Sequence, residues 1–448
     1  LGSTHPLNGN FSQICSFHLL SILPTAPAVG AAMDGSPRLP HLNPAFQHAW
    51  MALGAIWLLL TFVPILAFRL LKRWCCFSPR LNHSRGRVVL ITGSNTGIGF
   101  ESALALYRGG ATVILACRNA EKAAAARARM EACSLHPEGR VMTVSLDLAS
   151  FASVRACAAL LDAGGDYPAL DSIVLNAGRN GQGGTSVDGC EEVYQTNYLG
   201  HFLLLQLLLP SLLTAADGGG GTYGTSDGEE LAATALAQAG FSRVVCVGSV
   251  MHHWGQFDAE RSATYHLDTP HAAGAEAKLP LGRWEPDAYC DSKLHLILLA
   301  AAVEARYAAR GVRGVSVNPG AVASDIWRDS FPAWFVPVWK MIMACLFLTS
   351  AQGAETTIAA LTAPLPDASG AAEGGCSVAH YFVPYLLPFQ YCSPSYLCDP
   401  LQFLPFETLG MYAGAWRIAP DLRGADAAAA GEKLWAQSEA LLRRFGKK

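Results

Sequence analysis

The sequence predicts an α/β fold, a doubly wound parallel sheet with helices on both faces. Short apolar runs alternate with Ala-rich or amphipathic helical stretches from Arg87 to about Pro366. Such alternation is typical of parallel strands joined by helical crossovers. The first run ends in a glycine-rich turn that leads directly into a helical stretch. The expected strands are Val88–Ile91, Thr112–Ala116, Val141–Ser145, Ser172–Leu175, Arg243–Val247 and Gly314–Val317.

The turn after the first strand reads Thr-Gly-Ser-Asn-Thr-Gly-Ile-Gly, from Thr92 to Gly99. Glycine allows a positive φ and a close approach of the backbone to a ligand. The helix N-terminus that follows offers unpaired N–H groups and a partial positive charge to a pyrophosphate. The turn therefore predicts a Rossmann-type dinucleotide site, although a turn without a ligand is the alternative for this motif alone. The turn residues expected to bind the dinucleotide are Gly93, Ser94, Asn95, Thr96, Gly97, Ile98 and Gly99.

The end of the second strand bears on the choice of nucleotide. An acid at this point binds the ribose 2′-hydroxyl in NAD sites. Here Cys117 is followed by Arg118, and a guanidinium suits a 2′-phosphate. We therefore expect NADP(H), with an ordinary surface arginine as the alternative.

Tyr289 and Lys293 form a Tyr-x-x-x-Lys motif. Residues i and i+4 share a helix face, so the ammonium can lie beside the phenol. A free tyrosine titrates near pH ~10. A nearby ammonium and an oxidised nicotinamide ring are expected to lower that pKa, so that Tyr289 acts as a general acid/base.

The order of the motifs carries more weight than any one of them. The glycine-rich turn is followed by Asn176-Ala177-Gly178, by Asn197 in a helical stretch, by Ser249 at a strand end, by the Tyr-x-x-x-Lys motif and by Asn318-Pro319-Gly320. Most of these lie at strand ends, where open α/β sheets bind ligands.

In this order the motifs resemble the short-chain dehydrogenase/reductase family, and within it the membrane-anchored, retinol-dehydrogenase-like group. Ala-Cys-Arg after the second strand, Ser-Val-Met-His-His after the fifth and the late Lys433-Leu434-Trp435 fit that group. Val250-Met251-His252 is also similar to the plant forever-young oxidoreductase. The resemblance is strong over residues 86–366 and weak beyond them. Long insertions after Leu213 and between Ser249 and Tyr289 depart from the family pattern.

The resemblance implies a catalytic tetrad of Asn197, Ser249, Tyr289 and Lys293. In the family the serine orients the substrate oxygen, the tyrosine transfers the proton, the lysine holds the ribose and the asparagine positions a relay water. It also implies that Asp147 accepts from the adenine amino group and that Ser324 contacts the nicotinamide carboxamide. Beyond the turn, the implied cofactor contacts are Arg118, Asp147, Leu148, Asn176, Ala177, Gly178, Tyr289, Lys293, Pro319, Gly320, Val322 and Ser324.

The segment Ala49–Phe68 is uncharged and mostly apolar, and its length suits a bilayer core of ~30 Å. Basic residues and no acid follow it up to Arg87, which predicts that the C-terminal side faces the cytosol. A signal peptide is the weaker alternative, because its basic flank would lie on the other side. We expect a single-pass membrane protein with a cytosolic catalytic domain. The expected location is the endoplasmic reticulum, and another organelle membrane is the alternative.

Four segments are expected: a leader over 1–45 with a candidate native start at Met33, an anchor over 46–73, the catalytic domain over 86–366, and a C-terminal extension over 367–448 with an apolar block and a terminal helix. The net charge of −3 and the absence of a basic run argue against nucleic acid as a partner. The 13 Cys are scattered without metal-ligand spacing, so no metal is expected. The sequence leaves open whether the protein forms a homodimer.

The apolar and aromatic stretch Phe331–Leu348 suggests a lipophilic substrate of retinoid, steroid or long-chain carbonyl type, with ordinary core packing as the alternative. The block Tyr381–Phe406 could contact the membrane interface or cover the sheet edge. The expected function is NADP(H)-dependent interconversion of a carbonyl and an alcohol. The alternatives are an NADPH reductase of a tetrapyrrole ring and a non-catalytic nucleotide-binding membrane scaffold.

Overall fold

The computed structural model describes the chain in ranges from Ser84 onward. They are 84–133, 136–162, 165–181, 184–217, 242–249, 251–252, 255, 257, 286–320, 322–324, 326, 336–362, 396–398 and 425–445. The expected anchor Ala49–Phe68 and the candidate start Met33 lie outside these residues. So do nearly all of the two insertions and Phe331–Phe335.

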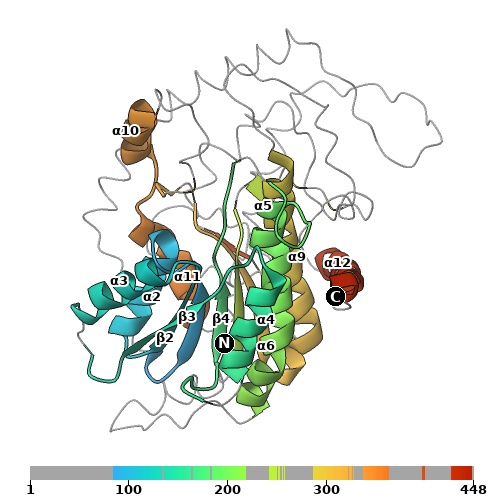
Figure 1. Ribbon diagram of the computed structural model, residues 1–448, viewed down its shortest axis with the longest axis horizontal. Helices are drawn as coiled ribbons and strands as arrows, with labels where there is room; N and C mark the ends of the chain where they lie inside the picture. Colours follow the sequence, from blue (N-terminus) through green and yellow to red (C-terminus); the bar gives the residue numbers. More distant parts are fainter. Residues whose placement is uncertain are drawn as a thin grey trace, which may run out of the picture. The chain divides into compact units, whose positions relative to one another are not determined.

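One parallel sheet of seven strands, in the order β3-β2-β1-β4-β5-β6-β7, forms the centre of the described fold (Figure 1). The strands are β1 Val88–Thr92, β2 Thr112–Cys117, β3 Arg140–Ser145, β4 Ser172–Leu175, β5 Ser242–Val247, β6 Val312–Asn318 and β7 Tyr396–Cys398. The first six confirm the expected strands to within two residues at each end. The strand order reverses between β1 and β4, and such a switch point is where these folds bind ligands.

Two helical layers cover the sheet (Figure 1). One contains α2 (Gly97–Arg108), α3 (Ala120–Glu131) and α11 (Ser350–Thr362), and the other contains α4 (Phe151–Asp162), α6 (Gly200–Asp217) and α9 (Pro286–Tyr307). Successive strand residues face opposite layers: Val89 and Ile91 pack with the first, and Leu90 packs with the second. This burial on both faces explains why the strands read as continuous apolar runs.

The chain enters α6 through a short helix, α5 (Glu192–Tyr194), and a π-helical segment, η2 (Gln195–Leu199). The stretch Glu192–Ala216 is long and apolar enough to cross a membrane, and among the described residues it alone passes that test. However, 61% of its most apolar window is buried inside the domain. It is therefore the core helix of the second layer.

A last helix, α12 (Ala425–Phe445), packs on α9 (Figure 1). Its buried residues include Leu434, Trp435, Leu441 and Leu442. Two hydrogen bonds join it to η2 and α6. Tyr198 Oη in η2 lies 2.8 Å from Ser438 Oγ, and Gln206 Nε2 in α6 donates to Glu439 Oε1 at 3.0 Å. A bidentate pair from Arg306 to Glu432, at 2.7 and 2.6 Å, joins it to α9.

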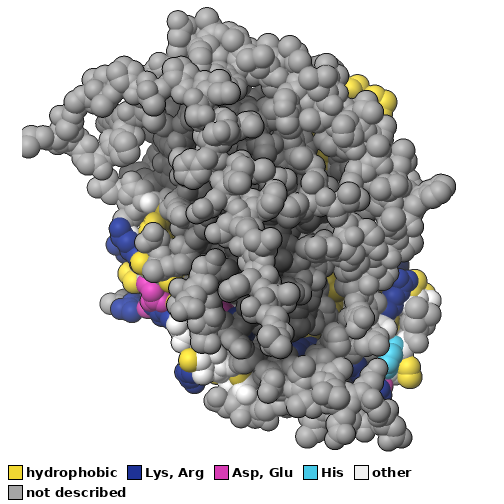
Figure 2. Space-filling view, turned by 180° about the vertical axis from the view of Figure 1, so that it is seen from behind, with side chains coloured by type: hydrophobic (Ala, Val, Ile, Leu, Met, Phe, Trp, Pro, Cys, Tyr) yellow, Lys and Arg dark blue, Asp and Glu magenta, His cyan; other side chains and the backbone are white. Residues whose placement is uncertain are grey.

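Two further elements lie within the apolar segments Phe331–Leu348 and Tyr381–Phe406, whose roles the sequence leaves open. Strand β7 adds to the open edge of β6, so three residues of the block Tyr381–Phe406 lie at the sheet edge. The helix α10 (Val336–Leu346) has only Lys340 as a charged residue, and its Val338 and Met341 are 43% and 63% exposed. Figure 2 shows hydrophobic side chains at the edge where Figure 1 places α10. A short 3-10 helix, η4 (Ala308–Arg310), lies between α9 and β6 in the sequence.

Candidate active site

The glycine-rich turn between β1 and α2 has the predicted backbone. Gly93 and Gly97 have φ values of 64° and 61°, in the left-handed region that favours glycine. A Cβ atom at Gly97 would have no described atom within 4 Å, whereas one at Gly99 would lie 2.5 Å from Asn176 Nδ2. Gly97 therefore leaves room for a ligand, and Gly99 allows tight packing.

Helix α2 begins at Gly97, and the side chain of its N-cap residue Thr96 caps no N–H group among the described residues. The N–H groups of the first turn are thus available beside the open space at Gly97. This arrangement fits a pyrophosphate, which the turn backbone and the helix N-terminus would hold.

The glycine-rich turn contacts the end of β2 through Ser94, Asn95 and Cys117. Ser94 is buried, and its hydroxyl donates to the Ile91 carbonyl oxygen at 2.8 Å. The backbone N–H groups of Ser94 and Asn95 hydrogen-bond the Cys117 thiol, whose pKa is raised by burial. The Ser94 side chain therefore shapes the turn, and the thiol is directed into the turn instead of outward.

Arg118 follows Cys117 at the end of β2 and is exposed. It makes no ion pair with any residue that the structure describes. The next residue, Asn119, caps α3 by accepting from the Lys122 N–H at 2.8 Å. Arg118 therefore lies between the end of β2 and the start of α3.

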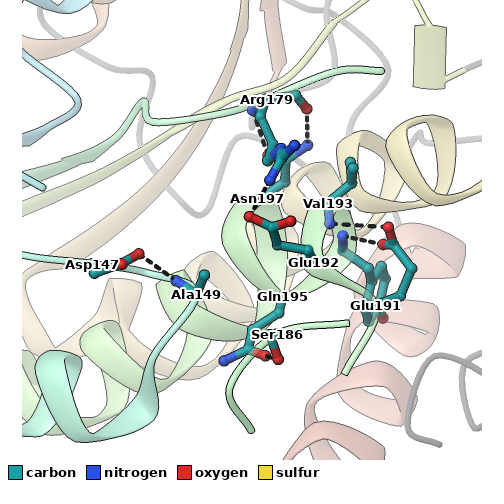
Figure 3. Close-up of polar contacts among 10 residues, drawn as sticks. Asp147, Ala149, Arg179, Ser186, Glu191, Glu192, Val193, Gln195 and Asn197 are labelled. Atoms are coloured by element: carbon teal, nitrogen blue, oxygen red, sulfur yellow. Dashed lines mark hydrogen bonds and ion pairs between the residues drawn. The ribbon is translucent and has the colours of Figure 1, made fainter. Parts of the chain in front are cut away.

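Asp147 lies just beyond β3 and is half-buried. Its Oδ1 accepts from the Ala149 N–H at 3.0 Å (Figure 3), and its own N–H donates to Ser153 Oγ at 2.9 Å. The neighbouring Leu148 is buried against Gly200, where a Cβ atom would lie 2.4 Å from the Leu148 carbonyl oxygen. The carboxyl group is thus held by its own turn at the edge where the other strand ends meet.

The ends of β1 and β4 are tied together at the switch point. Thr92 Oγ1 accepts from the N–H groups of Asn176 and Ala177, both at 2.9 Å. Asn176 Nδ2 donates to the Thr92 carbonyl oxygen at 2.8 Å. A Cβ atom at Gly178 would lie 3.5 Å from both Asn197 Oδ1 and Lys293 Nζ. The strand-end motif therefore lies directly beside Asn197 and Lys293, two of the residues expected to be catalytic.

Ser249, Tyr289 and Lys293 come together as the resemblance implies. Tyr289 and Lys293 are buried in α9, and Lys293 Nζ lies 5.7 Å from the centre of the Tyr289 ring. Lys293 Nζ donates to the Val247 carbonyl oxygen at 2.9 Å, at the end of β5. A side-chain hydrogen bond joins Tyr289 to Ser249.

Burial controls the protonation of this cluster. It raises the pKa of Tyr289 above its ordinary value, and the bond with Ser249 opposes the rise only in part. The nearby ammonium therefore does not by itself lower the pKa of Tyr289 as expected, because the desolvation of the phenolate outweighs it. The further lowering by an oxidised nicotinamide ring stays a prediction. Burial also lowers the pKa of Lys293 to about 8.

Asn197 lies in the π-helical segment η2, within the helical stretch that the sequence predicts. Its Oδ1 accepts from the Arg179 N–H at 2.8 Å, and its Nδ2 donates to the Arg179 carbonyl oxygen at 3.0 Å (Figure 3). The same Nδ2 also donates to Ser292 Oγ at 3.1 Å. The Arg179 side chain forms an ion pair with Glu192. The amide of Asn197 thus fixes the backbone that follows Gly178, and π-helical turns often mark functional sites.

The loop after β6 returns beside the glycine-rich turn. Gly320 has a φ of 94°, and its N–H donates to Asn318 Oδ1 at 3.3 Å. Val322 is buried and pairs with Leu348 in an isolated bridge. A Cβ atom at Gly353 would contact both Val322 and Ile98. Pro319 is buried and Ser324 half-buried in this loop.

Sequence reasoning missed one residue of the site, His201. It is buried in α6, with Nε2 2.9 Å from Thr92 Oγ1 and Nδ1 2.8 Å from the Asn197 carbonyl oxygen. A single histidine in an apolar helix carries no signal that separates this position from an ordinary core residue.

Known proteins are similar to this chain in sequence. A family model described as short chain dehydrogenase matches residues 87–222. The dehydrogenase/reductase SDR family member 13 of Homo sapiens is 33% identical over 300 residues, which cover 66% of this chain and 68% of that protein. The chain belongs to the short-chain dehydrogenase/reductase family.

Two retinol dehydrogenases are also similar. Retinol dehydrogenase 11 of Homo sapiens is 33% identical over 297 residues, covering 66% of this chain and 79% of that protein. Retinol dehydrogenase 14 of Mus musculus is 31% identical over 310 residues, covering 66% of this chain and 80% of that protein. This member of the short-chain dehydrogenase/reductase family is therefore a retinol-dehydrogenase-like oxidoreductase, and the family uses NAD or NADP.

Proposed function

We propose that the protein is an NADP(H)-dependent enzyme that interconverts a carbonyl and an alcohol on a lipophilic substrate of retinoid, steroid or long-chain type. The observation that carries the proposal is the hydrogen-bonded pair Tyr289–Ser249, with Lys293 beside it and Gly178 next to the lysine. The cluster lies at the strand ends where the glycine-rich turn also lies. When bound, the nicotinamide supplies or accepts a hydride.

Each residue has a defined part in the proposed reaction. In reduction, the Tyr289 hydroxyl donates its proton to the oxygen of the carbonyl, and in oxidation the phenolate accepts it back. The Ser249 hydroxyl orients that oxygen, because it already bonds the Tyr289 side chain. Burial keeps Tyr289 protonated, which is the form that a proton donor for reduction needs.

The choice of NADP(H) is supported by the end of β2. The Cys117 thiol is hydrogen-bonded by the turn, and the exposed Arg118 makes no ion pair with the described residues. An acid would repel a 2′-phosphate, and none stands at these two positions. A guanidinium can bind such a phosphate through two hydrogen bonds.

Two apolar features support a lipophilic substrate and a membrane location. The helix α10, which follows β6 in the sequence, exposes Val338 and Met341. The sequence also contains the apolar segment Ala49–Phe68, followed by basic residues. We propose that this segment anchors the protein in the endoplasmic reticulum or another organelle membrane, with the active site in the cytosol.

The test is a turnover screen with the full chain purified in detergent. Reduction of retinal, of steroid ketones and of long-chain aldehydes is measured with NADPH and with NADH, and the reverse reactions are measured with the corresponding alcohols. The proposal expects turnover of at least one class, faster with NADPH at equal concentration. Tight NADPH binding without turnover of any class would favour a scaffold and would reject the enzyme.

A further inference from the structure

His201 connects the nucleotide-binding turn to the catalytic asparagine. Its ring lies between Thr92, the first residue of the glycine-rich motif, and Asn197, in the π-helical segment η2. The ring is fully buried. The two contacts, at 2.9 Å and 2.8 Å, use both ring nitrogens.

The partners define which nitrogen carries the proton. Nδ1 faces the carbonyl oxygen of Asn197, which can only accept, so Nδ1 must carry a hydrogen. A neutral imidazole then leaves Nε2 as an acceptor. The neutral form is favoured because burial lowers the pKa of His201 to about 4. The hydrogen bond to the Asn197 carbonyl oxygen opposes this shift, and the charge of Lys293 adds a smaller lowering.

Thr92 is suited to donate to that acceptor. Its hydroxyl oxygen already accepts from the N–H groups of Asn176 and Ala177, both at 2.9 Å. Its single hydrogen can go to His201 Nε2 at 2.9 Å or to the Val174 carbonyl oxygen at 3.3 Å, and the shorter contact is the one to the histidine. A continuous chain of hydrogen bonds therefore runs from the end of β4 through Thr92 and His201 to Asn197.

The position of Asn197 matters for the residues around Lys293. Its side-chain amide holds both backbone polar groups of Arg179. The residue before Arg179 is Gly178, where a Cβ atom would lie 3.5 Å from Lys293 Nζ. A shift of Asn197 would thus be passed to the backbone beside the catalytic lysine.

We propose that His201 is a positioning residue of the active site: as the neutral Nδ1–H tautomer it accepts from Thr92 and donates to the Asn197 carbonyl oxygen, and so fixes Asn197 relative to the nucleotide-binding turn. Its effect on turnover rests on the proposed function. The hydrogen bonds themselves, and their effect on nucleotide binding, do not.

Two substitutions separate the two bonds. In His201→Asn the amide nitrogen lies near the place of Nδ1, so the bond to Asn197 can persist while the bond to Thr92 is lost. In His201→Gln the amide reaches the place of Nε2, so the bond to Thr92 can persist while the bond to Asn197 is lost. Loss of one hydrogen bond corresponds to a change of about tenfold in a rate or equilibrium constant.

The expected result is a split between the variants. His201→Gln lowers kcat about tenfold more than His201→Asn does, whereas His201→Asn raises the Kd for NADPH about tenfold more than His201→Gln does. The matched control is His295, a second buried histidine, whose Nδ1 lies 2.7 Å from Tyr194 Oη. His295→Asn and His295→Gln are expected to lower Tm without such a split.

A spectroscopic measurement reads the tautomer without turnover. Correlation spectra of the full chain in detergent, labelled with 15N-histidine, are compared with those of His201→Asn to assign the ring. The expected signal is a neutral Nδ1–H ring that does not titrate between pH 5.5 and 8, a range that lies above the pKa of about 4. An Nε2–H tautomer, a charged ring at neutral pH, or equal effects of both substitutions on the NADPH Kd would each overturn the proposal.

The failure of the proposed function would look different. If the wild type turns over no carbonyl or alcohol, the enzyme proposal fails, and the role of His201 is then judged by the tautomer and by the NADPH affinities of the two variants alone.

Discussion

The Nζ atom of Lys293 lies 5.7 Å from the centre of the Tyr289 ring, and both side chains are buried in the same helix. The two groups respond to burial in opposite directions. The pKa of Tyr289 rises, and the pKa of Lys293 falls from 10.5 to about 8. Both shifts favour the neutral form, as desolvation requires.

The lowered pKa of Lys293 predicts opposite effects of alkaline pH on activity and on stability. Activity is expected to fall above pH 8, where the folded protein loses the Lys293 proton. The unfolded chain keeps this proton up to a pKa of 10.5, so between these two values the unfolded state binds more protons and Lys293 makes stability rise with pH. The measurements are kcat/KM and the free energy of unfolding in urea from pH 7 to 10.5.

The control for the stability effect is Lys293→Met. Buried thiols such as Cys157, with a pKa raised to about 12, act in the opposite direction at alkaline pH, and they are the same in both proteins. The difference between wild type and Lys293→Met should therefore change with pH between 8 and 10.5. A constant difference would show that the lysine is not desolvated.

Tyr289→Phe is expected to remove nearly all turnover and to leave NADPH binding intact. The phenol is the proposed proton carrier, and loss of general acid/base catalysis costs ~10²–10⁴-fold. Single-turnover kinetics and the NADPH Kd from nucleotide fluorescence are the two measurements. Retention of wild-type rates on any accepted substrate would contradict the proposed mechanism.

Arg118→Ala is expected to raise the KM for NADPH far more than the KM for NADH. A charged hydrogen bond to the 2′-phosphate contributes ~1.5–3 kcal/mol, or roughly 10- to 150-fold. The control is Arg127→Ala, an exposed arginine of α3 that pairs with Glu131. Equal effects on both nucleotides would show that Arg118 does not contact the 2′-phosphate.

The membrane topology is tested with an engineered glycosylation acceptor. An Asn-x-Thr site is inserted at Gly218–Gly221, in the insertion that follows α6 in the sequence. We expect no glycan, because the basic flank after Ala49–Phe68 keeps this side in the cytosol. We also expect extraction by detergent and not by alkaline carbonate. A glycan at this site would place the active site in the lumen.

Trp435→Ala is expected to destabilise the domain by ~3–5 kcal/mol, the usual cost of removing a buried tryptophan. Trp435 packs edge-on against Phe202 at 5.1 Å, and Arg306 lies 4.4 Å from the centre of its ring. Arg443→Ala on the same helix is the control, because Arg443 is exposed and its ion pair with Glu439 is a surface pair. Urea unfolding of both variants in parallel gives the comparison.

The sequence predicted the central sheet well because its strands are buried on both faces. Each apolar run, such as Ser172–Leu175, is bounded by polar or glycine-containing segments, so its ends are visible in the pattern. Strand β7 was not predicted, since it has only three residues and lies inside a long apolar block. The π-helical form of Gln195–Leu199 depends on hydrogen-bond register, which leaves no mark in residue spacing.

Motif order predicted that Ser249, Tyr289 and Lys293 lie together, but it could not give their electrostatics. Tyr289 and Lys293 were expected together, and the structure brings them together. The direction of the Tyr289 pKa shift depends on how much of the ring is buried, and that is a property of the packing around α9. His201 was missed for a related reason, because its role follows from its two partners, Thr92 and Asn197.

The position of α12 has a consequence for biosynthesis. The contacts that fasten it, between Tyr198 and Ser438 and between Gln206 and Glu439, join residues separated by 240 and 233 positions. Every strand of the sheet is translated before this helix, and domains fold from the N-terminal side as they are made. Until α12 is synthesised, the apolar side of α6 and α9 that it covers is exposed to the cellular quality-control machinery. Nascent chains that stall or terminate before α12 should therefore be bound by chaperones and degraded, even though their nucleotide-binding turn is complete.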